Sequence, residues 1–187
     1  LYYRLYFGVT LSNYYLENVK GNDNETLTMR AEARFMRAMF MYYLMDLYGN
    51  VPIKTSVSSE STPQSSRSEV FEEIEKELKD IVGDGEGNEV LADKRATYGR
   101  ADKVAGWILL SRLYLNAEVY TGSAQWQKAK DYADKAIKGG YSLCTEGKNG
   151  YSAYQLLFMG DNDTNGAQNE IVLPAIHDGM ETQTWGG

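Results

Sequence analysis

The strongest constraint on the fold is one long helical segment, predicted over residues 27–48. Its apolar residues recur at helical spacing, and the stripe they form is wide enough to be buried on two sides. The segment ends sharply, because Gly49 suits the position after a helix and Pro52 cannot continue one. Small alanines in the stripe would let a neighbouring helix approach closely. The stripe consists of Ala31, Phe35, Ala38, Phe40, Tyr42, Leu44, Met45 and Leu47.

Further helices are predicted on both sides of this segment. Thr26 or Thr28 is expected to cap the long helix, and Ser66 or Ser68 is expected to cap the helix that follows it. One short apolar run, residues 170–176, is the only strand predicted. The other predicted helices cover residues 2–19, where Gly8 is a weak disturbance, and then 69–82, 101–121, 125–138 and 151–158.

The helices are predicted to form two pairs, residues 27–82 and 101–138, followed by a loop-rich part at 139–187. The spacing of Trp, Ala and Tyr residues in the second pair resembles a tetratricopeptide repeat, with residues 118–124 as an insertion between its helices. We therefore expect an all-α fold of tetratricopeptide-like hairpins, an α/α superhelix with long loops and one short strand near the C-terminus. Residues 1–187 are expected to form a single domain of this kind.

Composition excludes several classes of protein. The chain has 26 acidic and 19 basic residues and a net charge of −7, which argues against nucleic-acid binding because phosphates require a basic surface. Cys144 is the only cysteine, so neither an internal disulfide nor a thiolate zinc site can form. No apolar run long enough to span a membrane is present. The chain starts at Leu1 without a signal peptide, so we expect an internal piece of a longer protein.

No set of catalytic residues stands out in the sequence. His177 is the only histidine, which makes a histidine-based triad or a multi-histidine metal site hard to build. The carboxylates of Glu72, Glu73, Glu75 and Glu77 are predicted to lie on a solvated helix face, and a glycosidase pair is the less favoured interpretation. We therefore expect a protein that is not an enzyme and has no cofactor, with calcium as the one exception considered.

That exception concerns the turn at residues 161–166. Asp161, Asp163 and Asn165 have the spacing of the first three ligands of a calcium loop, and a glycine follows them at the sixth position. The twelfth position should carry a bidentate glutamate, but Val172 stands there. The favoured interpretation is a polar turn. The alternative is an irregular calcium site that distant residues complete.

Residues 31–53 resemble the signature helix of the SusD/RagB family, the nutrient-binding cell-surface lipoproteins of Bacteroidetes-type bacteria. The resemblance rests on Ala31-Glu-Ala-Arg-Phe-Met-Arg-Ala and on Leu47-Tyr-Gly-Asn-Val-Pro-Ile53. Residues 101–115, 126–143 and 157–172 resemble three later blocks of the family in the same order.

The resemblance implies an all-α core and capture of a glycan or peptide without cleavage. It also implies a lipoprotein at the outer-membrane surface that delivers oligosaccharide to a SusC-type TonB-dependent transporter. The lipid-anchoring cysteine would lie outside this chain, because Cys144 is far inside it. Membrane attachment is expected only through that absent anchor.

Aromatic side chains are the natural candidates for contacts with a glycan, because the apolar C–H faces of sugars lie against flat rings. Trp185 lies in a polar segment after the predicted strand, and the resemblance implies that this region is near the ligand. Tyr151 and Tyr154 are weaker candidates for the same role. These three residues make up the predicted ligand-binding set.

Other large or charged residues are expected to have structural roles. Trp107 and Trp126 occupy helix positions that pack against neighbours, so they are predicted to lie in the core. Arg34 and Arg37 flank the long apolar stripe and are predicted to pair with acidic neighbours such as Glu32.

The alternative function is a tetratricopeptide adaptor that binds peptides or partner proteins. Such domains usually have short, regular loops. The long loops predicted at 54–66, 83–99 and 139–150 argue against this alternative.

Overall fold

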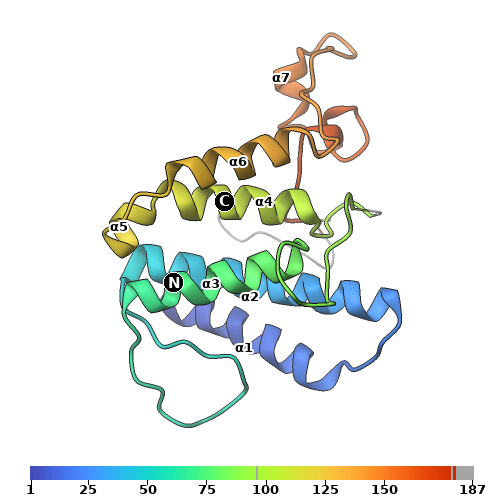
Figure 1. The fold of residues 1–187 in the computed structure, drawn as a ribbon. Helices are drawn as coiled ribbons and strands as arrows, with labels where there is room; N and C mark the ends of the chain where they lie inside the picture. Colours follow the sequence, from blue (N-terminus) through green and yellow to red (C-terminus); the bar gives the residue numbers. More distant parts are fainter. Residues whose placement is uncertain (96, 178, 180–187) are drawn as a thin grey trace.

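Helices account for all the regular secondary structure in the part of the chain that the computed structural model describes, residues 1–95, 97–177 and 179 (Figure 1). The all-α prediction is therefore confirmed. Within those residues the only β-type pairings are two isolated bridges, Val51 with Ser65 and Lys148 with Tyr151. The helices are α1 (Tyr2–Asn18), α2 (Asn24–Tyr48), α3 (Arg67–Ile81), α4 (Lys103–Leu115), α5 (Ala117–Thr121), α6 (Trp126–Ile137) and α7 (Ala153–Leu156), followed by the short 3-10 helix η1 (Ala167–Asn169).

The helices stack in the order in which they follow one another along the chain. α1 packs on α2, α2 packs on α3, and α4 packs on α6, whereas α2 and α4 have few contacts. Figure 1 shows the stack running from α1 to α6, with the part that carries α7 projecting beyond the end of α6. The loose contact between α2 and α4 leaves one side of α2 partly uncovered.

The ends of the helices follow from local hydrogen bonds. α2 begins three residues earlier than predicted, because Asp23 is its cap: the Asp23 carboxylate accepts hydrogen bonds from the N–H and the hydroxyl of Thr26 at 2.9 and 2.7 Å. The predicted caps at Thr26 or Thr28 are thus wrong. Gly49 ends α2 at a φ of 78°, a conformation that favours glycine. α3 begins at the predicted cap, Ser66, which forms a reciprocal capping box with Glu69.

Two elements in the second half of the chain differ from the prediction. The helix expected over 101–121 is interrupted at Asn116, whose side-chain amide donates to the carbonyl of Arg112 at 3.2 Å, so α4 and α5 are separate. The strand expected at 170–176 does not form among the described residues. A strand needs a neighbouring strand for its backbone groups, but the carbonyl of Val172 accepts a hydrogen bond from Arg95 instead.

Close contact between α1 and α2 explains the glycine in α1. Gly8 lies directly against the ring of Phe40, and a β-carbon at this position would overlap three atoms of that ring. Glycine has a low helix propensity, but here it allows the two helices to lie close together.

A buried carboxylate connects α2 to α3. Glu77 is only 6% exposed, although its position in α3 predicted a solvated side chain. Its two oxygens accept hydrogen bonds from Arg34 and Arg37 of α2, including Nε bonds of 3.1 Å from each arginine. Arg37 also donates to Asn13 of α1 at 2.8 Å, and Asn13 donates to the carbonyl of Lys54 at 3.1 Å. The two arginines therefore link three helices and a loop, and Glu32 is not their partner.

Two similar side-chain clusters hold α6 in place, one against α3 and α4 and the other against the turn after α3. In one cluster the hydroxyl of Tyr114 donates to Glu75 at 2.6 Å, and Lys128 lies over the Tyr114 ring and 3.3 Å from the same carboxylate.

The second cluster repeats the pattern. Tyr132 donates to Asp84 at 2.9 Å, and Lys135 lies over the Tyr132 ring and 2.7 Å from Asp84. The rings of Tyr114 and Tyr132 are stacked, with centroids 5.6 Å apart. Burial, aided by the adjacent carboxylates, raises the pKa of both phenols, so each remains a hydrogen-bond donor.

The two tryptophans of the second pair have different environments. Trp107 is partly buried and packs against the core, as predicted. Trp126 is 62% exposed, so its predicted core position is wrong. It is the first residue of α6, whose buried residues are Ala129 and Tyr132. Among the described residues, no helix combines the length and the apolar character needed to cross a bilayer.

The buried carboxylate of Glu77 leads to the first testable prediction. Replacing Glu77 with Gln should lower the free energy of unfolding by about 3 kcal/mol, because Arg34 and Arg37 lose their shared counter-charge while partly buried. Urea denaturation monitored by circular dichroism would measure the change. Glu72→Gln, at an exposed position of the same helix, should change it by less than about 0.5 kcal/mol. Equal effects of the two substitutions would contradict the assignment.

Candidate functional site

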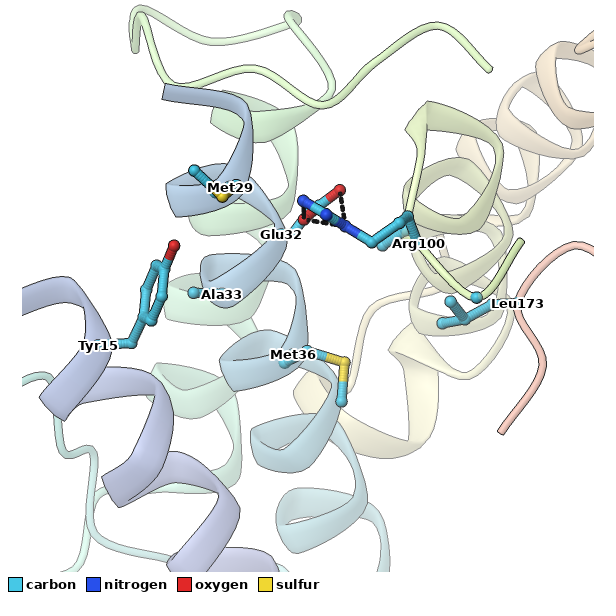
Figure 2. Close-up of a pocket in the computed structure, with 9 residues that line it drawn as sticks. Tyr15, Met29, Glu32, Ala33, Met36, Arg100 and Leu173 are labelled. Carbon is cyan, nitrogen blue, oxygen red and sulfur yellow. Dashed lines mark hydrogen bonds and ion pairs between the residues drawn. The ribbon is translucent and has the colours of Figure 1, made fainter. Parts of the chain in front are cut away.

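A trough crosses the uncovered side of α2 and has a volume of about 380 Å³ (Figure 2). Figure 2 shows Tyr15 of α1 on one side and Arg100 and Leu173 on the other, with residues of α2 between them. This volume lies within the range of small-molecule sites, about 300–1,000 Å³. Most of the lining is apolar. The trough is lined by Tyr15, Met29, Glu32, Ala33, Met36, Gly99, Arg100, Ala101 and Leu173.

An ion pair is the principal polar feature of the trough. Both carboxylate oxygens of Glu32 accept hydrogen bonds from Nε of Arg100, at 2.9 and 2.8 Å, and Nη2 of Arg100 makes a further contact with Glu32 (Figure 2). These hydrogen bonds and the charge of Glu32 raise the pKa of the guanidinium above its usual value. The pair cancels its own charge, so the trough has no net charge.

The wall that carries Arg100 is held in place by the buried carboxylate of Asp102. Asp102 caps α4 by accepting from the N–H of Ala105 at 3.1 Å, and it also accepts from the N–H of Arg95 at 2.9 Å. The hydroxyl of Tyr141 donates to the same carboxylate at 2.6 Å. Asp102 therefore fixes the loop before α4 and the segment after α6 around one point.

Arg95 holds the segment that carries Leu173, on the same side of the trough as Arg100. Its guanidinium donates to the carbonyls of Val172 and Gln168, at 2.5 and 2.9 Å, and lies over the rings of Tyr98 and Tyr141. These bonds place the neighbouring Leu173 where it lines the trough.

The predicted stacking residues Tyr151 and Tyr154 lie elsewhere, on the projecting part that carries α7 (Figure 1). Tyr154 is 71% exposed and makes an edge-to-face contact with Phe158, which is 73% exposed, at a centroid distance of 5.1 Å. Tyr151 is 46% exposed and precedes the helix. Phe158 was not predicted, although its spacing of four residues from Tyr154 on a helix is a usable signal.

The predicted calcium turn uses its polar groups internally. The side-chain amide of Asn165 donates to Asp161 and to the carbonyl of Leu156, both at 3.0 Å, and its oxygen accepts from the N–H of Ala167 at 3.0 Å. Asn165 thus presents N–H groups, not a free oxygen, to Asp161, which suits a polar turn better than a cation. Asp163 is exposed. Calcium binding at this turn remains a prediction that these contacts do not favour.

Two sequence candidates remain, Trp185 and His177. Trp185 lies outside the described residues, so its predicted role stays a prediction. His177 is exposed. Within the described ranges, no three His, Cys, Asp or Glu side chains come together in a group that could hold a metal.

The trough itself was not predicted from the sequence, because Tyr15, Glu32 and Arg100 are far apart in the sequence and have no shared local pattern.

Comparisons with known proteins agree with the fold. A family model described as "Starch-binding associating with outer membrane", of the SusD-like type, matches residues 1–115. The starch-binding protein SusD of Bacteroides thetaiotaomicron is 41% identical over the whole of this chain, which spans 32% of that protein's length. The chain therefore belongs to the SusD-like family and corresponds to about a third of this relative.

Solved structures show the same fold. A laminarin-binding SusD-like protein superposes on 94% of this chain with a TM-score of 0.74 at 22% identity, and the match covers 37% of that protein. A protein solved with xylogluco-oligosaccharide superposes on 87% of this chain with a TM-score of 0.71 at 24% identity, which covers 32% of it. At these identities the likeness establishes the fold alone.

The role of Arg95 can be tested by removing its guanidinium. Arg95→Ala should release residues 168–173 from the helices, because both carbonyl contacts and both ring contacts are lost. Hydrogen–deuterium exchange should then rise in this segment and stay unchanged in α2 and α3. Lys130→Ala, on the exposed side of α6, serves as the control. Unchanged exchange in residues 168–173 of the Arg95 variant would contradict this role.

Proposed function

We propose that this chain is part of a protein that captures oligosaccharides at the outer-membrane surface without cleaving them. The observation that carries the proposal is the exposed aromatic pair Tyr154 and Phe158, on a segment that projects from the helical stack. Large exposed apolar groups usually mark an interaction surface. Membership of a family described by starch binding supports a glycan as the class of ligand for this surface.

The chemistry of the pair also suits a sugar. A pyranose ring presents C–H groups on its faces and hydroxyls around its edge, so it can lie against an aromatic ring while its hydroxyls stay in water. Tyr154 adds a hydroxyl that can donate to or accept from the ligand. Tyr151 lies just before the same helix and is 46% exposed, so we propose it as a further contact for the ligand. Trp185 is proposed as a further stacking residue on the basis of its sequence alone.

Binding without catalysis is supported by how the carboxylates of the helical body are used. Glycoside hydrolysis needs two carboxyl groups that face a sugar, with one available as an acid. Glu77 is held between two arginines, Glu75 and Asp84 accept from tyrosines, and Glu32 is paired with Arg100. These carboxylates have structural partners, so they are poor candidates for proton transfer.

Delivery to a SusC-type TonB-dependent transporter completes the proposal. The family description, association with the outer membrane, supports a location at that surface. The rival function, a tetratricopeptide adaptor for peptides, is less favoured because the family model that matches residues 1–115 is described by starch binding.

A double substitution tests the aromatic surface. Replacing Tyr154 and Phe158 with Ala should weaken binding of malto- or laminari-oligosaccharides about tenfold or more, because stacking contacts are lost at an exposed site. Isothermal titration calorimetry with the 187-residue chain would measure the change. Leu143→Ala, a similarly exposed residue in the same loop-rich part, is the matched control.

The same sample tests the absence of catalysis. Incubation with each oligosaccharide should produce no new reducing ends over a day. Reducing ends that increase with time and with protein concentration would overturn the non-catalytic assignment.

A further inference from the structure

We propose that the trough on α2 is a second saccharide subsite and that it selects an uncharged sugar unit. This inference rests on the proposed function, since it concerns the same class of ligand. The trough is separate from the aromatic pair of the projecting part: it is lined by α1, α2, the loop before α4 and Leu173. The subsite would therefore engage a different part of a glycan, or a different glycan molecule.

The walls of the trough match the two kinds of surface on a sugar. Tyr15 supplies an aromatic ring at one side, and Ala33 and Met36 form a low apolar floor between it and the opposite wall (Figure 2). The small side chain of Ala33 keeps the floor open. A sugar ring can place its C–H face against Tyr15 and the floor while its hydroxyls point toward Glu32 and Arg100.

The ion pair can bind hydroxyls without rearranging. Arg100 uses Nε and Nη2 for Glu32, and its Nη1 makes no hydrogen bond to any described residue. A carboxylate has lone pairs for about four hydrogen bonds, so Glu32 retains acceptor capacity beside this bridge. A fixed donor next to a fixed acceptor can bind two neighbouring hydroxyls of one sugar. Because the pair already holds both side chains, little side-chain entropy is lost when the ligand binds.

The charge of the trough favours a neutral sugar over an acidic one. Glu32 and Arg100 are the only charged residues among the nine that line it, and they neutralise each other. A uronic acid would bring a carboxylate close to Glu32, and it would have to displace Glu32 to pair with Arg100. A neutral hexose or pentose carries no charge for Glu32 to repel, so the subsite should discriminate between sugars by their charge.

The first test changes the shape of the trough, either by removing the aromatic ring of Tyr15 or by filling the floor at Ala33. Tyr15→Ala and Ala33→Leu should each weaken binding of a neutral oligosaccharide at least about fivefold, by loss of the ring and by filling of the floor respectively. Tyr15→Phe and Ala33→Ser keep the ring and the space, so they should bind as the unchanged chain does. Calorimetry with malto-, laminari- and xylogluco-oligosaccharides supplies the measurement, and circular dichroism verifies that each variant is folded.

The second test changes the charge selectivity. Glu32→Gln leaves the charge of Arg100 unbalanced, so binding of an oligogalacturonide should increase while binding of the neutral oligosaccharide falls. Asp134→Asn removes an exposed ion pair with Lys130 on α6 and should change neither affinity. A structural effect of Glu32→Gln would lower both affinities together, so the opposite changes are specific to the proposed subsite.

The outcomes separate this inference from the proposed function. If oligosaccharides bind and the Tyr15 and Ala33 variants bind equally well, the subsite is wrong while glycan capture stands. If the unchanged chain binds the oligogalacturonide more tightly than every neutral oligosaccharide, the selectivity is wrong. If the chain binds neither class of oligosaccharide, both the subsite and the proposed function are overturned.

Discussion

The fold depends on the burial of one carboxylate, that of Glu77, between Arg34 and Arg37. A buried carboxylate is stable only when its charge and its hydrogen-bonding capacity are matched, and these two arginines provide both. Because Arg37 also binds Asn13, and Asn13 binds the loop after α2, the cluster fixes α1, α2 and α3 in one orientation. That orientation buries the Phe35 and Ala38 side of α2 and leaves the Ala33 and Met36 side to form the trough.

Local sequence signals predicted most of the helical framework. The apolar period and Gly49 located α2, and Ser66 located the start of α3, because these features act within a few residues. The interruption at Asn116 was missed since the residues on both sides favour a helix. Glu77 and Trp126 were misplaced for a related reason: their burial depends on which distant segment packs against them, and helical period alone does not contain that information.

The candidate sites also divide into those that local sequence can indicate and those that depend on distant segments. Tyr151 and Tyr154 could be chosen from the sequence because they lie together in a polar, loop-rich region, and both are exposed. The trough could not be chosen, because it forms only when α1, α2 and the loop at Arg100 come together. The resemblance of the long helix to a family signature identifies the scaffold. It does not locate a ligand site, because the signature side chains lie mainly in the core.

The paired clusters around Tyr114 and Tyr132 have a consequence for how α6 is positioned along its neighbours. Lys128 and Lys135 are seven residues apart, or two turns of α6, and each reaches its own carboxylate. A slide of α6 by one turn, about 5.4 Å, would remove both lysines from both partners at once. Apolar packing alone would tolerate such a shift far better. The clusters therefore fix the register of α6 along its neighbours, so that the last hairpin of the stack has one defined alignment.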